Sequence, residues 1–597
     1  MNHFIISGIF LILSINQFKA QTSKPHFRDG EAQIVSAFYD PSQWIKEELW
    51  VQTNFDSDSN GRMDRMHVFL TRPLQTQTEG WKLPVIYMSS PYFAGTGGNS
   101  KKYNWNVKHE IGAVPPSHKN AKAKRKKNRP LESIFNDRMW VRRGYITVYS
   151  SSPGTGFSDG APTIGGINET LAPKAVIDWL CGRAKGYKTR TGNETVEATW
   201  CTGKIGMTGT SYNGTLCLAA ASTGVKGLET IIPVAPVSSW YEYYRSNGLV
   251  RSPGGFLGED MDVLYDFVHS GDPENRAHND SIIRDQYLVP GQDRITGDFN
   301  SFWATRDYLT QMDSMKCSLF MCHGFNDWNV MSEHSLRFYE KAKAMGLTSK
   351  IYYNQLAHGD PPPFEMMNKW FTHYLHGIDN GVEEIANAWI VSEDEFYPNP
   401  YKDFPNPAAK DVTFYLKEGS SSNGVLTTAS NESSNKTLSF TDNAEVAPVE
   451  LIFAENSENR LMFLTESLKN DLHISGRGKI TIQISSSKPA ANLSVYLVEL
   501  PKVYDPKTLK MKDIIVTRAW ADPQNYKSLE NGEALVPGKF YDLSFNFMPD
   551  DQVIDKGKQL GLLIFSSDKE FTLQPEKGTV LTVNLFNTNI VLPIVQD

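Results

Sequence analysis

Hydrophobic and polar positions follow two different patterns along this chain, and the pattern changes near residue 390. Before that point, short apolar runs alternate with longer helical stretches; the runs lie at 66–72, 84–89, 145–150, 228–237, 317–323 and 349–356. Strands that alternate with helices predict an α/β fold with a mostly parallel, doubly wound sheet. After it, short strands separated by polar turns, such as 479–485, 493–498 and 560–565, predict an all-β sandwich of the jelly-roll type.

The segment from 238 to 316 interrupts the alternation of strands and helices. It is rich in aromatic and charged residues and is too long for an ordinary connection. We therefore expect a helical cap, inserted over the carboxyl edge of the sheet between a first part of the core at 21–237 and a second part at 317–389. The β-sandwich is expected at 390–597.

The first 20 residues contain an apolar run, Phe4 to Ile15, that is too short to span a bilayer comfortably. We interpret residues 1–20 as a secretory signal peptide cleaved after Ala20, with a short buried helix as the alternative. Cleavage would leave an exported protein, periplasmic or secreted, with no membrane partner. The net charge of -7 argues against nucleic acid as a partner.

Cysteine usage excludes a disulfide-framework fold, because 5 cysteines are few for 597 residues and none has the spacing of a zinc site. Cys217, Cys317 and Cys322 lie in apolar runs and are expected in the core. Cys181 and Cys201 flank a polar excursion at 182–200. A disulfide between these two is one hypothesis, and a pair of free thiols is the equal alternative.

An acidic loop precedes the strand at 66–72. Asp56, Asp58, Asn60 and Gly61 occupy the first, third, fifth and sixth positions of a calcium loop, but the twelfth is His67 instead of the usual glutamate. We expect a hairpin turn with local Asx hydrogen bonds, and we expect no metal and no cofactor. Whether this loop binds calcium stays open.

A serine between a strand and a helix is the first candidate for chemistry. An apolar run leads into Gly209-Thr-Ser211-Tyr-Asn213-Gly214 and then into an alanine-rich helical run. The order is typical of the Gly-x-Ser-x-Gly turn that carries a nucleophilic serine, with Asn213 in place of the second glycine. Taken alone, the motif fits equally well a glycine-rich turn with an incidental serine.

Two further strands end in residues that would complete a catalytic triad. Asp327 follows the strand at 317–323, and His358 follows the strand at 349–356. Serine, acid and histidine in this order, each just beyond a strand, predict Ser211 as nucleophile, His358 as base and Asp327 as the group that orients the base. The backbone N–H of Tyr212 is expected to bind the oxyanion. The hydroxyl of Tyr92 is the second candidate donor, with a packed aromatic as its alternative.

Four segments are similar to the bacterial Xaa-Pro dipeptidyl-peptidases, which belong with the cocaine-esterase-like and α-amino-acid ester hydrolases. They are the Ser211 turn, the stretch from Ser238 to Asp260, the motif His323-Gly-Phe-Asn-Asp-Trp-Asn-Val330, and Ala357-His-Gly359. The resemblance implies an α/β-hydrolase core with a helical cap insertion, followed by an all-β jelly-roll sandwich domain. It also implies a serine exopeptidase that releases N-terminal Xaa-Pro dipeptides through an acyl-enzyme.

The resemblance assigns roles beyond the triad as well. Tyr92 matches the oxyanion tyrosine, and Glu259 matches the carboxylate that receives the free amino group of the substrate. Such a carboxylate would pair with the ammonium and exclude longer peptides. Read without the resemblance, Glu259 would be a salt-bridge partner in the cap. The other positions that match the substrate pocket are Trp240, Tyr243, Asn329 and Val330.

Two other functions stay open. An α-amino-acid ester hydrolase, acylase or esterase of the same superfamily would keep the triad and lose the proline pocket. A non-catalytic protein whose β-sandwich binds carbohydrate would need no triad. The lactic-acid-bacterial members begin with a helical domain involved in their dimer, for which this chain has no room before the core, so a homodimer is left open. The expected partners are peptides with proline at the second position.

Overall fold

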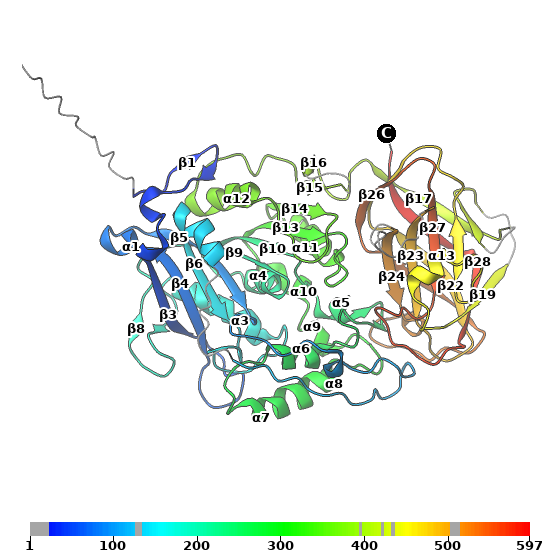
Figure 1. Ribbon diagram of the computed structural model, residues 1–597, viewed down its shortest axis with the longest axis horizontal. Coiled ribbons are helices and arrows are strands. Elements are labelled where there is room, and N and C mark those ends of the chain that lie inside the picture. The colour runs from blue at the N-terminus through cyan, green and yellow to red at the C-terminus, as the bar shows by residue number, and fades with distance from the viewer. Residues whose placement is uncertain are drawn as a thin grey trace, which may run out of the picture.

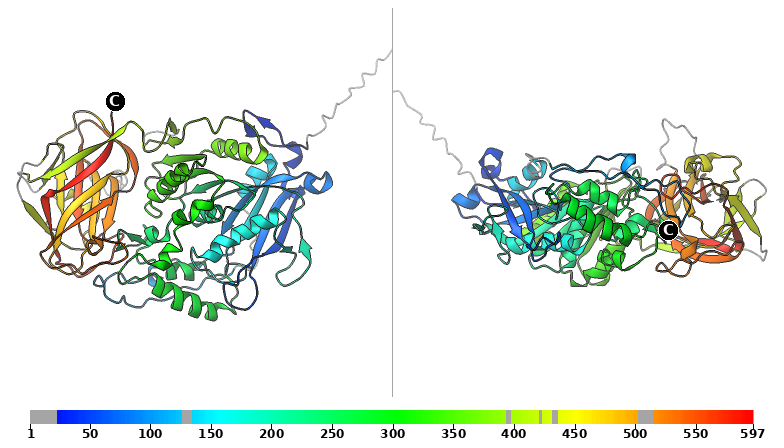
Figure 2. Two further views of the ribbon diagram at one scale, coloured as in Figure 1. Left: turned by 180° about the vertical axis from the view of Figure 1, so that it is seen from behind. Right: turned by 90° about the horizontal axis from the view of Figure 1, so that it is seen from below.

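The computed structural model describes residues 23–125, 134–392, 397–419, 423–430, 436–501 and 514–596. An N-terminal α/β part and a C-terminal β part lie side by side along the longest axis (Figure 1). The views from behind and from below keep the two parts separate at opposite ends (Figure 2). The signal peptide expected at 1–20 lies outside the described residues. None of the helices in the described ranges could cross a membrane.

A 12-stranded sheet forms the α/β part. Its strands from β15 to β6 run parallel, and antiparallel strands extend both edges. Across the sheet the order is β16 (Asn399–Tyr401), β15 (Ala388–Ile390), β14 (Ser349–Asn354), β13 (Ser318–Gly324), β10 (Leu228–Val234), β9 (Cys201–Thr210), β5 (Leu83–Ser90), β6 (Ile146–Ser151), β4 (Arg65–Pro73), β3 (Trp44–Gln52), β7 (Gly186–Tyr187) and β8 (Thr195–Val196).

Helices cover both faces of the parallel strands, which explains why these strands are apolar along their whole length. Met207 of β9 packs in one core with Leu216 of α4. Gly206, the residue before Met207 on β9, faces the opposite side of the sheet, where an added Cβ would lie 2.7 Å from the ring of Phe371 in α12. One face carries α3 (Ile167–Leu180), α4 (Tyr212–Ser222) and α11 (Glu333–Ala344), and the other carries α2 (Ile134–Trp140) and α12 (Phe364–His376).

Smaller elements complete the N-terminal region. They are β1 (Phe27–Arg28), β2 (Glu31–Ala32) and α1 (Gln75–Thr78). Pro173 lies inside α3. One detail differs from the sequence expectation: the sheet continues past residue 390, where the β-sandwich was expected to begin, because β16 pairs antiparallel with β15.

The cap contains short helices and one hairpin. Strands β11 (Arg245–Ser246) and β12 (Leu249–Val250) pair through a turn at Asn247 and Gly248, which both have positive φ. Asn-Gly is the residue pair that such a two-residue turn requires, so this signal was present in the sequence. The helices are α5 (Trp240–Tyr244), α6 (Met261–Val268), α7 (Arg276–Asn279), the π-helix η5 (Asp280–Leu288), α8 (Val289–Gly291), α9 (Ser301–Ala304) and α10 (Tyr308–Gln311).

The C-terminal part is built around the long strand β28 (Val580–Val595), which pairs with β17, β19, β21 and β22. Apolar side chains from these strands form a core separate from that of the α/β part. The other elements are β17 (Ala409–Lys417), β18 (Gly424–Thr427), β19 (Thr437–Thr441), α13 (Pro448–Phe453), β20 (Leu461–Leu464), β21 (Leu472–Gly476), β22 (Lys479–Ser486), β23 (Leu493–Leu500), β24 (Ile515–Ala521), β25 (Phe540–Asn546), β26 (Asp550–Ile554) and β27 (Gln559–Phe565).

The β part packs against the cap and the carboxyl edge of the sheet. Ser252 of the cap donates its backbone N–H to the carbonyl of Phe571 at 2.8 Å. Gln355, just beyond β14, donates to the carbonyl of Asp551 at 2.8 Å. The β part therefore borders the region where the parallel strands end, which is where ligands bind in such sheets.

The disulfide considered between Cys181 and Cys201 is not formed. All five cysteines are free thiols. The Sγ of Cys181 lies 3.6 Å from the carbonyl O of Gly203, whereas the Sγ of Cys201 accepts from the backbone N–H of Gly203 at 3.3 Å. Each thiol is thus engaged by a different group of the backbone.

Candidate active site

Ser211 lies at a sharp turn between β9 and α4. Its backbone has φ 64° and ψ -127°, a conformation that residues with a side chain rarely adopt. The turn is held by its ends, since the Ser211 N–H donates to the carbonyl of Val234 at 2.8 Å and the Ser211 carbonyl accepts from Thr215 N–H at 2.9 Å. A strained, half-buried serine at a strand-to-helix turn is the arrangement that presents a nucleophilic hydroxyl.

Glycines explain how the turn tolerates Asn213. A Cβ on Gly209 would lie 2.6 Å from the Cβ of Asn213, so the glycine makes room for the asparagine. A Cβ on Gly214 would lie 2.8 Å from the carbonyl O of Val234, so the helix can approach β10 only with glycine there. The departure from Gly-x-Ser-x-Gly therefore shifts the second close approach by one residue and keeps the turn.

Asp327 and His358 meet beyond β13 and β14. The Nδ1 of His358 lies 2.6 Å from the Oδ2 of Asp327. The loop of His358 also reaches the serine turn, because a Cβ on Gly359 would lie 3.3 Å from the Cγ2 of Thr210. The His358 side chain is 29% exposed, while that of Asp327 is fully buried. The structure thus brings the three residues predicted from the sequence to one edge of the sheet.

The carboxylate of Asp327 is held on both oxygens. Its Oδ1 accepts the backbone N–H groups of Asn329 and Val330, each at 3.0 Å. Burial alone would raise the pKa of Asp327, but hydrogen bonds from His323 and His358 outweigh it and hold the pKa below its usual value. Asp327 therefore stays ionised and can stabilise a charged His358.

His323, on β13, is a neighbour of Asp327 that we did not single out from the sequence. Its Nε2 lies 2.9 Å from the carbonyl O of Val330 and 3.2 Å from the Oδ2 of Asp327. Since a carbonyl can only accept, Nε2 carries the proton, and Nδ1 faces the hydroxyl of Ser335 at 2.6 Å. Its position four residues before Asp327 was the signal in the sequence that could have identified it as a neighbour of that acid.

Tyr212 begins α4, and its side chain is anchored away from the reaction centre. The hydroxyl donates to Oε2 of the buried Glu169, a residue that sequence reasoning missed, at 2.5 Å. The same carboxylate accepts backbone N–H groups from residues 163 to 165. In the first turn of a helix the backbone N–H has no intrahelical partner. The Tyr212 N–H therefore belongs to the positive end of α4, beside Ser211.

Tyr92 follows β5, the strand next to β9. Its ring packs edge-on against Tyr212, with centroids 6.0 Å apart. Burial first, and then the charges of Glu259 and Glu169, raise the pKa of Tyr92. Its hydroxyl therefore keeps its proton and can act as a hydrogen-bond donor.

Aromatic side chains of the cap pack against the turn that carries Ser211; together with Val330, Trp240 and Tyr243 form what we call the aromatic wall. Trp240 packs edge-on against Tyr212 at 4.9 Å and against Tyr243 at 5.7 Å. Tyr243 donates its hydroxyl to Oδ1 of Asn329 at 3.2 Å. Trp240 and Val330 are each only 1% exposed, so they fix the shape of this wall and present little surface themselves.

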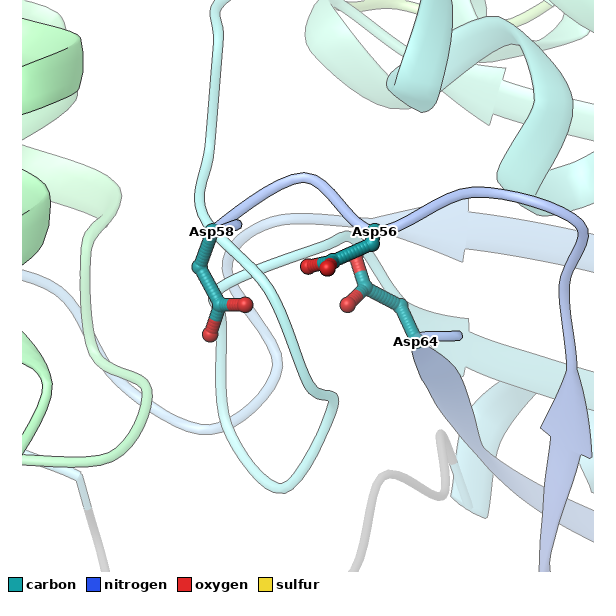
Figure 3. A group of neighbouring side chains, drawn as sticks. All are labelled: Asp56, Asp58 and Asp64. Atoms are coloured by element: carbon teal, nitrogen blue, oxygen red, sulfur yellow. The ribbon is translucent and has the colours of Figure 1, made fainter. Parts of the chain in front are cut away.

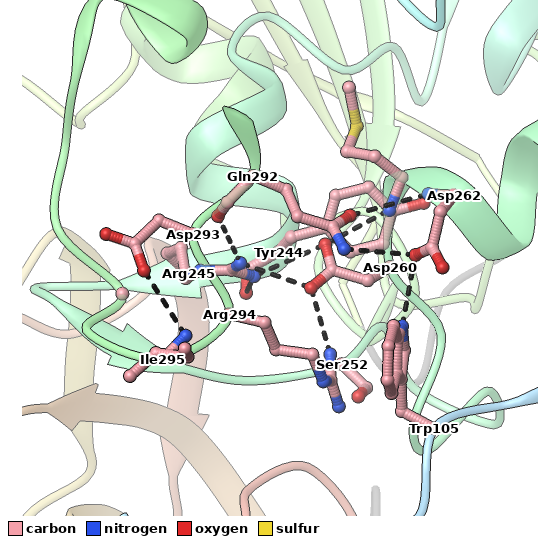
Figure 4. Close-up of polar contacts among 12 residues, drawn as sticks. Trp105, Tyr244, Arg245, Ser252, Asp260, Asp262, Gln292, Asp293, Arg294 and Ile295 are labelled. Atoms are coloured by element: carbon pink, nitrogen blue, oxygen red, sulfur yellow. Dashed lines mark hydrogen bonds and ion pairs between the residues drawn. The ribbon is translucent and has the colours of Figure 1, made fainter. Parts of the chain in front are cut away.

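Glu259 lies in the same region and has only a neutral partner. Its Oε1 accepts from the hydroxyl of Tyr244 at 3.0 Å, and none of the described ion pairs includes it. Its neighbour Asp260 differs, because Arg245 at 3.1 Å and Arg294 at 2.9 Å balance its charge (Figure 4). Burial raises the pKa of Glu259 to about 7. Glu259 is thus a half-buried carboxylate without an ion-pair partner among the described residues, directly beside Asp260, which has two.

Two family profiles match nearly the whole chain. Residues 60–360 match "X-Pro dipeptidyl-peptidase (S15 family)" and residues 380–593 match the "X-Pro dipeptidyl-peptidase C-terminal non-catalytic domain". The chain belongs to the S15 family of X-Pro dipeptidyl-peptidases. The chain is therefore a peptidase of the S15 serine family, and its β part corresponds to the family's C-terminal domain.

Relatives in the S15 family are similar over most of their length. A Rhodopirellula baltica protein, named provisionally as a Xaa-Pro dipeptidyl-peptidase, is 51% identical over 99% of this chain and 95% of its own. The Xaa-Pro dipeptidyl-peptidase of Ligilactobacillus salivarius is 32% identical over 97% of this chain and 80% of its own.

Solved structures show the same fold. An α-amino acid ester hydrolase matches with a TM-score of 0.65 and 15% identity over 97% of this chain and all of its own. A CocE/NonD family hydrolase from Staphylococcus aureus matches with a TM-score of 0.64 and 16% identity over 92% of this chain and 96% of its own. The S15 chain therefore has the α/β-hydrolase core with a cap and a C-terminal β-rich domain.

Proposed function

We propose that this protein is a serine exopeptidase that releases N-terminal Xaa-Pro dipeptides from peptides through an acyl-enzyme. The observation that carries the proposal is the Glu259 carboxylate, which lies without a cationic partner in the wall beside the Asp327–His358 pair. A half-buried carboxylate without an ion-pair partner suits a ligand that brings its own positive charge. The free amino terminus of a peptide is such a charge.

The acylation step uses the triad. Ser211 Oγ attacks the carbonyl carbon of the second substrate residue while Nε2 of His358 takes the hydroxyl proton. Asp327 holds the other ring nitrogen at 2.6 Å, which sets the tautomer and stabilises the imidazolium. The proton then passes from His358 to the leaving amine, so the shortened peptide departs and the dipeptide remains as an ester on Ser211. Water, activated by His358, releases the dipeptide.

The oxyanion is assigned to two donors, the backbone N–H of Tyr212 and the hydroxyl of Tyr92. The first lies at the N-terminus of α4, where the helix dipole also favours negative charge. The second keeps its proton because its pKa is raised. Each donor of this kind contributes about 3 kcal/mol to the transition state.

Specificity is assigned to the amino end of the substrate and to its second residue. Glu259 would pair with the ammonium and so fix how far the cut lies from the terminus. The wall of Trp240, Tyr243 and Val330 would shape the space for a proline ring, with Asn329 holding Tyr243 in place. A peptide with further residues at its amino end would place an uncharged backbone amide beside Glu259 instead of an ammonium.

Export is part of the proposal, because the apolar run from Phe4 to Ile15 fits a signal peptide. An exported peptidase of this specificity would act on proline-containing fragments outside the cytoplasm.

Comparison of three anilides tests the activity. Ala-Pro-anilide should be cleaved with the highest kcat/KM, Ala-Ala-anilide less well, and N-acetyl-Ala-Pro-anilide least. Equal turnover of the first two substrates would favour an α-amino-acid ester hydrolase or acylase instead. If a fluorophosphonate does not label the protein, the mechanism with Ser211 as the nucleophile is refuted.

A further inference from the structure

The loop between β3 and β4 places three aspartates around one point on the side of the α/β part. One carboxylate oxygen from each of Asp56, Asp58 and Asp64 can be chosen so that all lie within 4.8 Å of one another. Figure 3 shows the carboxylates of Asp56 and Asp64 pointing toward each other, with an oxygen of Asp58 turned toward them. This acidic loop takes no part in the reaction proposed above.

Two of the three side chains are buried with an oxygen to spare. Asp58 and Asp64 are each 1% exposed. The Oδ1 atoms of both have no hydrogen-bond partner among the described residues. A buried carboxylate oxygen without a partner is costly, because its hydration has been lost and nothing replaces it.

Protein cations do not compensate the cluster. None of the described ion pairs includes Asp56, Asp58 or Asp64, whereas the nearby Asp159 and Asp272 share Arg190. The cluster therefore carries more negative charge than its surroundings balance.

We propose that the acidic loop binds one Ca²⁺ ion through the carboxylates of Asp56, Asp58 and Asp64. All the donors are oxygens, which is the ligand set of hard cations and excludes the soft and imidazole-binding metals. The three oxygens lie within 4.8 Å of one another, which is close enough for one shared Ca²⁺ with Ca–O bonds of about 2.4 Å. Mg²⁺ demands near-ideal octahedral geometry and gives up its water molecules reluctantly, so a site built from three protein carboxylates favours Ca²⁺.

The loop is held in place by backbone contacts that leave room for an ion. The two oxygens of Asp56 accept the N–H groups of Asn60 at 3.1 Å and Gly61 at 2.7 Å, which are the Asx bonds expected from the sequence. Each carboxylate oxygen has a second lone pair, so these bonds do not prevent coordination.

The position of the loop gives the ion a structural role. The glycine-rich loop at 152–160, which follows β6, packs closely on the acidic loop, because a Cβ on Gly160 would lie 2.2 Å from the Oδ2 of Asp64. From the cap, Asn275 donates to the Oδ2 of Asp58 at 3.4 Å and His278 contacts the carbonyl of Asp58 at 3.0 Å. Calcium at this point would fasten the β3–β4 hairpin, the glycine-rich loop and cap helix α7 together.

Metal content and thermal unfolding of the full chain test the proposal. After dialysis against CaCl₂, elemental analysis should find one calcium per chain. Relative to EDTA, CaCl₂ at a hundredfold excess over Kd should raise Tm by about 3 °C, and an equal concentration of MgCl₂ should raise it much less. A chain without bound calcium whose Tm ignores CaCl₂ would overturn the proposal, and so would an equal response to MgCl₂.

Asparagine variants locate the ion. Asp64→Asn and Asp58→Asn should weaken calcium binding by roughly tenfold or more, yet in EDTA they should be as stable as the parent because each removes a repelling charge. Asp522→Asn is the matched control, since Asp522 is also a buried carboxylate but lies in the β part. Calcium should still raise the Tm of that control. A full calcium response in Asp64→Asn would refute the site.

Hydrogen exchange supplies an independent readout. Calcium should slow exchange in residues 56–64, 154–160 and 275–279 of the parent protein and leave the β part unchanged. Stabilisation without protection in these three segments would place the ion elsewhere and refute the assignment.

Discussion

Replacement of Glu259 by glutamine is the most informative perturbation of the proposed site. Glutamine has the same shape, and its carbonyl oxygen can still accept from the Tyr244 hydroxyl, which lies 3.0 Å from the carboxylate. The substitution therefore removes one negative charge and little else. Since Arg245 and Arg294 already balance Asp260, no neighbouring carboxylate is free to take over the role.

The size of the effect follows from the burial of the pair. Removing one partner of a buried charge pair costs about 2 to 4 kcal/mol in binding, which is about 30-fold to 900-fold in kcat/KM. The loss should apply to Ala-Pro-anilide. N-acetyl-Ala-Pro-anilide carries no ammonium, so its kcat/KM should change by less than about threefold, and the preference for a free amine should narrow.

The assay is kcat/KM for both anilides at pH 7.5, with labelling by a small fluorophosphonate as a check on the triad. Glu242→Gln is the matched control, because Glu242 belongs to the same cap but pairs with Arg337 at 3.2 Å. The control should behave as the parent protein. An unchanged ratio between the two anilides in Glu259→Gln would show that Glu259 is a structural residue of the cap and that the amine is bound elsewhere.

The pH dependence of the same contact has a definite sign. Burial raises the pKa of Glu259 to about 7, so its ionised form, and with it the binding of an ammonium, is present above that pH and is lost as the pH falls through it. In a Ser211→Ala background, the Kd of the dipeptide Ala-Pro should rise about tenfold per unit below pH 7. Adding Glu259→Gln should flatten this profile, and an equally steep profile in the double variant would contradict the reasoning.

Four further outcomes are expected. Ser211→Ala should lower kcat by roughly 10⁵-fold or more with Tm unchanged, and near-normal activity of the purified variant would disprove the triad. His323→Leu removes a donor to Asp327 and should lower kcat about tenfold with little change in KM, whereas His323→Gln, which keeps an N–H donor, should retain most of the activity. Gly214→Ala should destabilise the fold by about 1–3 kcal/mol in urea unfolding, because its Cβ would meet the carbonyl of Val234. Thiol titration in guanidinium without reductant should find all 5 cysteines free; three free thiols would instead mean that a disulfide forms.

The sequence by itself determined the central strands of the α/β part and which residues were candidates for chemistry. Strands β5, β6, β13 and β14 lie within two residues of the apolar runs that predicted them. The order Ser211, Asp327, His358 pointed to a triad before any contact was known. Such features follow from neighbouring residues, because the period of apolar positions and the chemistry of a turn are local properties of the chain.

The tertiary structure decided how distant segments meet, and no local pattern contains that information. It placed β14, β13, β10, β9 and β5 side by side, so that residues 92, 211, 327 and 358 share one edge. It also left Glu259 without a cation and Asp64 buried, although both are ordinary acids in the sequence. The state of a carboxylate depends on burial and on partners far away in the chain, and these are fixed only when the chain is packed.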